Sequence, residues 1–292
     1  MNLSPLSRWT EDQGLVEGEF PFTRRDFITI TQMLHEHSGI AMGEGKAALV
    51  YSRLVKRLRA LGLRSFREYC RLIGDVHQVA ERHAMISALT TNVTRFFREP
   101  HHFDYLRDEV LPPLIAHAKL GGRVRLWSAA CSSGQEPYSM ALTLLSVLPE
   151  APNLDVKILA SDIDANVLTQ ARSGIYRLDD TIPVPEALRR RWFSNLGDGQ
   201  LQISDAARAL VDFQDINLIG DWPFSGKFDA IFCRNVVIYF DVPTQEKIWS
   251  RFATLMGPKA SLCIGHSERV NGPAAQQLRL VGPTTYVSGA RS

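Results

Sequence analysis

The sequence predicts an α/β protein, with a doubly wound and mostly parallel sheet preceded by a small all-helical domain. From about Gly122 onward, apolar runs of strand length alternate with segments of helical periodicity, an order typical of a parallel sheet covered by helices. From Phe22 to about Leu89 the apolar residues recur at helical spacing only. The expected regions are a mobile leader (1–21), a helical domain (22–89), a linker (90–121) and an α/β domain (122–292).

Composition is that of an ordinary globular protein. The chain has 292 residues, 45% of them hydrophobic, with 33 Lys+Arg against 31 Asp+Glu and a net charge of +2. No run approaches the ~20 apolar residues that span a bilayer, and the first residues lack the pattern of a secretory signal. The 4 cysteines are scattered, which favours free thiols over disulfides or a zinc site. We expect a cytoplasmic protein that does not insert into membranes.

The helical domain is predicted to begin with two helices. Thr23 and Asp26 form the pattern of a capping pair at the start of the first helix. Glycines from Gly39 onward interrupt it before a second helix begins near Lys46, and Gly62 is suited to end that one.

The second helix has one apolar arc and one basic arc. Between Ile40 and Ile73 the chain carries eight basic and two acidic residues, a local excess of positive charge. Such an excess is either a solvated helix face or a docking surface for an acidic partner, and the sequence leaves both open. The residues predicted for docking are Lys46, Arg53, Lys56, Arg57 and Arg59.

In the α/β region the elements follow one another in a regular order. Strands are expected over 123–130, 156–164, within 228–240, over 260–268, and as a closing pair within 278–289. The helices between them are expected over 135–148, 165–174 and 243–256. An interruption over about 175–216, with strand-like pieces at 200–203 and 210–216, is predicted to be an inserted antiparallel β subdomain.

Ligands of such a fold bind beyond the carboxyl ends of the strands. The first strand end reads A-A-C-S-S-G-Q-E, with the single glycine Gly134 and the acid Glu136, where a dinucleotide site would have G-x-G-x-x-G. Asp162 ends the second strand, where an acid can accept ribose hydroxyls, and Asp164 is better placed as a helix N-cap. A carboxylate in the glycine loop suits a cationic ligand, so this pair points to S-adenosylmethionine rather than NAD.

Two further polar segments flank these strand ends. The string TTNVTRFFREPHHF precedes the sheet, and its adjacent His101 and His102 would point in different directions on a helix, so we expect no metal site. The run CRNVVIYF supplies Arg234, Asn235 and Tyr239 at a strand end, although a tyrosine in such a run is more often a core residue.

Six motifs in this order resemble the CheR family of chemotaxis receptor methyltransferases: TTNVTRFFRE, WSAACSSGQEPYS, ASDID, ARSGIYR, DAIFCRNVVIYF and GHSE. The similarity runs from about Phe22 to Tyr286. It implies a helical domain, a linker and a Rossmann-like domain with an inserted β subdomain. It also implies transfer of methyl from S-adenosylmethionine to glutamate side chains on the helical signalling domain of methyl-accepting chemotaxis receptors, which leaves S-adenosylhomocysteine.

The resemblance also implies roles for individual residues. Arg98 and Tyr239 would lie beside the transferred methyl as catalytic residues. Gln135 departs from the family pattern, because many members have a second acid there. The implied cofactor-binding residues are Asn92, Thr94, Arg98, Glu136, Asp162, Asn217, Leu218, Arg234 and Asn235.

Partners follow from the same resemblance. The basic helix would meet an acidic receptor helix. Some members also bind a receptor's C-terminal pentapeptide through the β subdomain, but the turn SNLGDG looks short, so we expect an enzyme without this tether. We also expect a monomer. An RNA or other protein methyltransferase is the alternative, with few aromatic residues on the basic face to support nucleic-acid binding. A non-catalytic adaptor is disfavoured because Arg98 and Tyr239 are both present.

Overall fold

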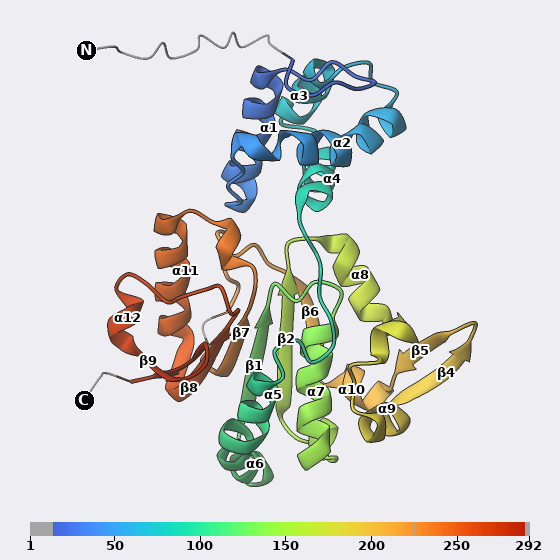
Figure 1. The fold of residues 1–292 in the computed structure, drawn as a ribbon. Coiled ribbons are helices and arrows are strands. Elements are labelled where there is room, and N and C mark those ends of the chain that lie inside the picture. Colours follow the sequence, from blue (N-terminus) through green and yellow to red (C-terminus); the bar gives the residue numbers. More distant parts are fainter. Residues whose placement is uncertain (1–13, 225, 290–292) are drawn as a thin grey trace. The chain divides into compact units, whose positions relative to one another are not determined.

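The computed structural model describes residues 14–224 and 226–289 and divides the chain into two compact units. The first unit ends at Thr91 and the second begins at Asn92, and each is described by itself (Figure 1). In the described parts of the chain, no helix is long and apolar enough to cross a membrane.

The first unit consists of helices. Its capping box is formed as predicted, with Thr23 and Asp26 each accepting from the other's backbone N–H. Gly39 and Gly62, in the left-handed region with φ of 76° and 66°, end the first two helices. The elements are α1 (Arg24–Ser38), a 3₁₀ turn (Glu44–Lys46), α2 (Ala47–Leu61), α3 (Phe66–Gly74) and α4 (Val79–Leu89).

Of the expected mobile leader, residues 1–13 lie outside the described residues. Hydrogen bonds join residues of the described part, 14–21, to the helical unit. The backbone N–H of Leu15 donates to the carbonyl of Phe22, and that of Phe20 donates to the Tyr51 hydroxyl at 3.1 Å. Phe20 is buried, so this otherwise polar segment places one apolar side chain in the core of the helical unit.

The second unit is built on a seven-stranded sheet with the strand order β6-β2-β1-β7-β8-β10-β9. The first five of these strands pair in parallel. Strand β10 pairs antiparallel with both of its neighbours, β8 and β9. The strands are β1 (Val124–Ala129), β2 (Val156–Asp162), β6 (Val211–Asp215), β7 (Phe228–Cys233), β8 (Met256–Ile264), β9 (Leu278–Gly282) and β10 (Thr285–Ser288). Helices α7 (Gln135–Val147), α8 (Ala165–Ser173), α11 (Val242–Leu255) and α12 (Ala274–Gln277) connect them. The predicted α/β class is confirmed.

A separate three-stranded antiparallel sheet, in the order β3-β5-β4, lies on the side of this unit away from β8 and β9 (Figure 1). Its strands are β3 (Ile175–Arg177), β4 (Phe193–Gly197) and β5 (Gln200–Ile203), accompanied by α9 (Glu186–Trp192) and α10 (Asp205–Ala209). The expected insertion over 175–216 is wrong at its C-terminal end. There β6 pairs in parallel with β2 in the main sheet, because strand periodicity does not identify the partner strand.

Residues 92–121 belong to the second unit, although we expected them to be a linker. A helical segment packs its apolar side chains, such as Phe103, Leu106 and Leu111, into the core. It consists of α5 (His101–Tyr105), a π-helical turn (Leu106–Val110) and α6 (Leu111–Lys119). The polar string that precedes it is thereby held to the α/β unit.

Candidate active site

The parallel register brings four loops to one edge of the sheet. Ala129, the last residue of β1, is paired with Ser161 of β2 and with Cys233 of β7. Cys233 is in turn paired with Ile264 of β8. The segments that follow these strands therefore start side by side, and four of the residues predicted for the cofactor lie at or soon after these strand ends: Glu136, Asp162, Arg234 and Asn235.

The loop after β1 is a tight turn that leads into α7. Ala130 and Ser132 have positive φ values of 62° and 50°, and Gly134 has a φ of 92°. A Cβ on Gly134 would lie 2.8 Å from the Tyr176 hydroxyl and 2.9 Å from the Ala171 Cβ, so the position has no room for a side chain. The single glycine of the motif therefore serves close packing against α8 and β3.

Asp162 ends β2 and is 6% exposed. Its carboxylate accepts from the backbone N–H of Ser132 at 2.8 Å and of Asp164 at 3.0 Å. Burial raises the pKa of Asp162 to about 6, although these hydrogen bonds oppose the shift. An ionised carboxylate with lone pairs left over can accept the vicinal hydroxyls of a ribose.

Asn92 is bound to the same strand ends. Its side-chain amide donates to the Asp164 carboxylate at 2.8 Å, and its backbone carbonyl accepts from the Ser132 hydroxyl at 2.9 Å. Asp164 also accepts from the backbone N–H of Asn166, which confirms its predicted place as the N-cap of α8. The polar string before the sheet is thus joined to the ends of β1 and β2.

Arg234, directly after β7, lies between two carboxylates. Its guanidinium is 3.1 Å from Glu136 Oε2 and 3.2 Å from Glu99 Oε2, and the Arg234 side chain is only 2% exposed. It also donates to the carbonyl of Arg98. The Ser128 hydroxyl donates to the other oxygen of Glu136 at 2.7 Å. We call Glu99, Glu136 and Arg234 the acidic cluster.

The acidic cluster contains two carboxyl groups and one guanidinium. Burial raises the pKa of Glu136, and the charge of Arg234 and the Ser128 hydrogen bond only partly oppose this. Burial also acts to raise the pKa of Glu99, but the charge of Arg234 and the hydrogen bond from His266 outweigh it and hold that pKa below its usual range. One guanidinium shared by two carboxylates favours a cationic group nearby.

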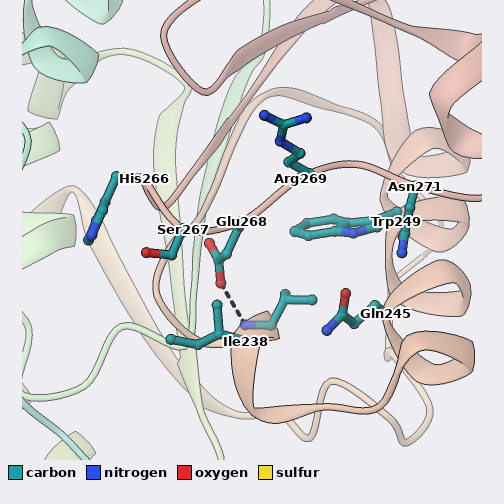
Figure 2. Close-up of a pocket in the computed structure, with 9 residues that line it drawn as sticks. Ile238, Gln245, Trp249, His266, Ser267, Glu268, Arg269 and Asn271 are labelled. Carbon is teal, nitrogen blue, oxygen red and sulfur yellow. Dashed lines mark hydrogen bonds between the residues drawn. The ribbon is translucent and has the colours of Figure 1, made fainter.

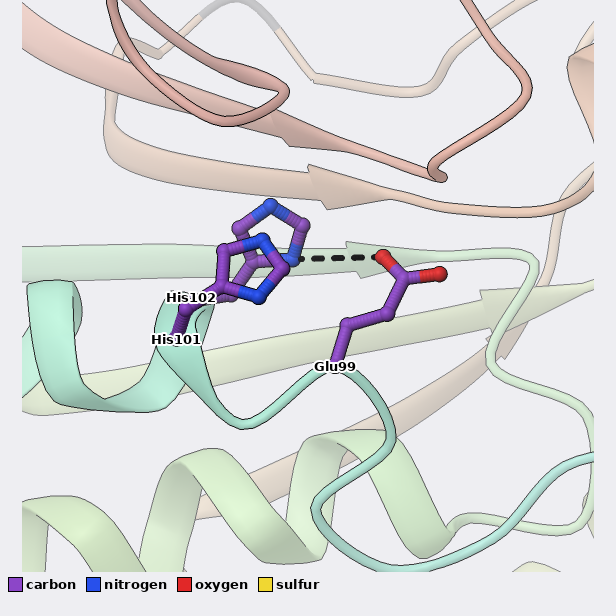
Figure 3. Close-up of side chains that lie close together, drawn as sticks. All are labelled: Glu99, His101 and His102. Atoms are coloured by element: carbon purple, nitrogen blue, oxygen red, sulfur yellow. Dashed lines mark ion pairs between the residues drawn. The ribbon is translucent and has the colours of Figure 1, made fainter.

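Glu99 also approaches two histidines (Figure 3). Ligand atoms of Glu99, His101 and His102 lie within 4.8 Å of one another, and His102 Nε2 is 3.0 Å from the Thr284 hydroxyl. Burial and the charge of Arg234 lower the pKa of His102 to about 3, so its ring is neutral at pH 7. This group borders the acidic cluster, because the same Glu99 carboxylate pairs with Arg234.

The remaining predicted residues lie on adjoining segments. Leu218 is buried, and its carbonyl accepts from Arg251 at 2.9 Å. Arg98 donates to the carbonyl of Val93 at 3.1 Å. The other residues predicted for cofactor binding or catalysis are Thr94 before α5, Asn217 after β6, Asn235 after Arg234, and Tyr239 in a 3₁₀ turn (Val237–Tyr239).

Several residues of this edge were missed by sequence reasoning. Glu99 lies in the polar string next to Arg98, but nothing in the string distinguishes it from a surface acid. Ser128 and Ser132 look like ordinary residues of the strand and the turn. Glu268 ends the GHSE motif after β8, and the strand-end rule applied to this fourth strand would have singled it out.

The predicted docking arginines are partly used inside the helical unit. Arg53 donates to the carbonyls of Leu89 at 2.8 Å and Thr90 at 2.7 Å and so caps α4. Arg57 pairs with Glu81, with Nε 3.1 Å from Oε1. The predicted basic face is therefore reduced to three exposed side chains, Lys46, Lys56 and Arg59.

Arg59 itself has a partner, Glu19, at 2.9 Å from its Nε atom. The pair is on the surface, with the Arg59 side chain 59% exposed, so it can exchange for an external carboxylate at little cost.

Comparison with known proteins agrees with this geometry. The model described as "CheR methyltransferase, all-alpha domain" matches residues 25–90, and "CheR methyltransferase, SAM binding domain" matches residues 92–287. A "Probable chemotaxis protein methyltransferase" of Rhizobium etli is 53% identical over 257 residues, 87% of this chain and 96% of that one. "Chemotaxis protein methyltransferase 2" of Pseudomonas aeruginosa is 44% identical over 92% and 94% of the two chains. The Escherichia coli "Chemotaxis protein methyltransferase" is 42% identical over 89% of each. The protein belongs to the CheR family of chemotaxis protein methyltransferases.

Proposed function

We propose that the protein transfers the methyl group of S-adenosylmethionine to glutamate side chains on the helical signalling domain of chemotaxis receptors, in the cytoplasm. The family membership supports the reaction class. The observation that carries the proposal is the acidic cluster beside Asp162, because this edge of the sheet offers carboxylates both to a cationic group and to ribose hydroxyls.

The residues at this edge fit the cofactor. S-adenosylmethionine, when bound, supplies a methyl group on a positively charged sulfur. Glu136 is suited to its cationic amino acid portion and Asp162 to its ribose. Side chains on the neighbouring loops would complete the site, and these are Asn92, Thr94, Arg98, Asn217, Leu218, Arg234 and Asn235.

No general base is required for this reaction. A glutamate has an ordinary pKa of about 4.3 and is already ionised at pH 7. The chain must orient this carboxylate and limit water around it, and good alignment can supply ~7 kcal/mol or more. Arg98 can hold a carboxylate with two parallel hydrogen bonds, and the Tyr239 hydroxyl can donate a third. We propose these two as the residues that orient the acceptor.

In this proposal the exposed side chains of Lys46, Lys56 and Arg59 contact the receptor. Exposed ion pairs contribute only about 0–1 kcal/mol each, so this face would steer an acidic helix rather than bind it tightly.

We further propose a monomer that needs no pentapeptide tether. The hairpin between β4 and β5 turns through Asp198 and Gly199, both with positive φ, which leaves only a short loop for a peptide. Calorimetry with a receptor C-terminal pentapeptide tests this, and micromolar binding would contradict it.

The reaction is tested by incubating the protein with labelled S-adenosylmethionine and the signalling domain of a chemotaxis receptor. We expect label on the receptor that alkali releases, as a methyl ester requires. Alkali-stable label, or label on RNA instead of the receptor, would contradict the proposed function.

The roles of Arg98 and Tyr239 are tested separately with Arg98→Ala and Tyr239→Phe. Both should slow turnover at least tenfold, while binding of S-adenosylhomocysteine to Tyr239→Phe stays within threefold of wild type. Wild-type turnover in both variants would remove these two residues from the mechanism.

A further inference from the structure

A carboxylate outside the acidic cluster binds the backbone of the segment that carries Tyr239. Glu268, on the loop after β8, is 5% exposed. One of its oxygens, Oε1, accepts from the N–H groups of Val236 at 2.9 Å and Val237 at 2.7 Å. The other, Oε2, accepts from Asn235 at 3.0 Å and Gly265 at 2.6 Å. Figure 2 shows the Glu268 carboxylate directed at the turn that contains Ile238.

The bound segment lacks the support of the sheet. Strand β7 ends at Cys233, so the N–H groups of Asn235 to Val237 lie beyond its ladder. Asn235 has a φ of 59°, in the left-handed region that asparagine adopts more readily than most residues, so the chain turns sharply at this point. Successive backbone N–H groups directed at one point form an anion-binding nest, and the carboxylate supplies the anion. The conformation of this turn therefore depends on Glu268.

Gly265 gives the carboxylate its access to the turn. A Cβ at this position would lie 2.7 Å from the backbone nitrogen of Asn235 and 2.8 Å from Glu268 Oε2. Both distances are shorter than a Cβ contact allows, so one of the two segments would have to move. The glycine thus allows the loops after β7 and β8 to approach closely, and the Glu268 carboxylate holds them at this distance.

We propose that Glu268 is a positioning residue for methyl transfer. Its four hydrogen bonds fix the turn over residues 235–239, and through this turn they place the Tyr239 hydroxyl against the acceptor carboxylate. The inference rests on the proposed function, which gives Tyr239 its role. A displacement near 1 Å at a reacting centre can cost about 100-fold in rate, so the turn has to be held firmly.

The test is the variant Glu268→Gln. Glutamine keeps the shape but has one acceptor oxygen, and its NH₂ group faces two N–H donors. We expect kcat for receptor methylation to fall 30- to 100-fold, with the KM for the receptor within threefold of wild type. The matched control is Asp229→Asn at the opposite end of β7, where the carboxylate accepts from the backbone N–H of Arg125 at 2.8 Å. It removes the same charge and should leave kcat within twofold.

A double-mutant comparison separates positioning from general stability. If Glu268 acts through Tyr239, adding Glu268→Gln to Tyr239→Phe lowers kcat by less than threefold, because the hydroxyl that it places is already gone. A full 30-fold loss in the Tyr239→Phe background, or wild-type kcat in Glu268→Gln alone, would overturn the proposal.

Two further results complete the design. If Glu268→Gln does not fold, Gly265→Ala keeps the carboxylate and displaces the same turn, and wild-type kcat in that variant would equally overturn the inference. Absence of receptor labelling by the wild-type protein would contradict the proposed function itself. A wild-type protein that labels the receptor, with variants that label it equally well, would contradict only the role of Glu268.

Discussion

Each unit of the molecule contains an arginine bound to buried carboxylates, but the balance of charge differs. In the helical unit Arg57 pairs with Glu81, which is 6% exposed, and the Tyr69 hydroxyl donates to the same carboxylate at 2.8 Å. In the α/β unit Arg234 lies between two carboxylates, those of Glu99 and Glu136. The first group is neutral in total, whereas the second has an excess of negative charge.

This difference indicates two uses of the same ion pair. Burying charges costs several kcal/mol per ion, and a balanced, hydrogen-bonded pair recovers that cost within the fold. In a cluster with more charges of one sign, part of the free-energy cost of burial is not recovered. A ligand of opposite charge can then recover it on binding. The Arg57–Glu81 pair is therefore suited to hold the helical unit together, and the acidic cluster is suited to bind a cationic ligand.

The largest expected effect comes from Glu136→Gln. Removing this carboxylate takes the excess negative charge from the cluster, while Arg234 keeps its pair with Glu99. We expect affinity for S-adenosylmethionine to fall about 100-fold, or about 2.7 kcal/mol. The free energy of unfolding should change by less than about 1 kcal/mol, because burial already disfavours this charge. Calorimetry and urea unfolding measure the two quantities. An affinity within threefold of wild type would show that the acidic cluster does not differ from the Arg57–Glu81 pair in serving binding.

Glu81→Gln should do the reverse. It leaves Arg57 without its ionised partner and weakens the hydrogen bond from Tyr69. Because the Arg57 side chain is 33% exposed and water replaces part of the lost interaction, we expect a loss of about 2 kcal/mol in the free energy of unfolding. Cofactor affinity should stay within twofold. A variant with wild-type stability would show that the pair is not structural.

Cofactor affinity should also depend on pH. The pKa of Asp162, about 6 in the fold against an ordinary 3.8, means that its carboxylate is mostly ionised at pH 7 and mostly protonated at pH 5. Ribose hydroxyls need the ionised form, so affinity should fall about tenfold from pH 7 to pH 5. Glu136, whose pKa is also raised, acts in the same direction. Calorimetry at pH 6 should show proton release on binding, and a flat profile between pH 5 and 7 would contradict this reading of Asp162.

The smallest effect is expected on the basic face. Lys46→Glu together with Lys56→Glu should lower kcat/KM for the receptor about three- to tenfold at low salt and leave cofactor affinity unchanged. The charge-matched control, Lys119→Glu with Lys157→Glu, lies on the α/β unit away from the active edge and should not change kcat/KM. Equal rates for the two double variants would make the basic face a solubility feature.

Much of the candidate site could be predicted from the sequence because the strand-end rule is a rule of chain position. Asp162 and Arg234 lie at the ends of apolar runs and Glu136 follows the turn after another, and the parallel register then brings such ends together. The helix caps at Thr23 and Asp164 were readable for a similar reason, since a cap depends on neighbours within three residues.

The sequence by itself therefore determined the α/β class, the helical first unit and the edge of the sheet where the candidate site lies. Only the tertiary structure decided that β6 joins the main sheet, that Arg53 and Arg57 bond within their own unit, that Glu99 pairs with Arg234, and that Glu268 binds the turn after β7. The physical reason is that periodicity reports which face of an element is apolar. The partners of a buried charge lie on segments far away in the chain, and packing alone brings them into contact.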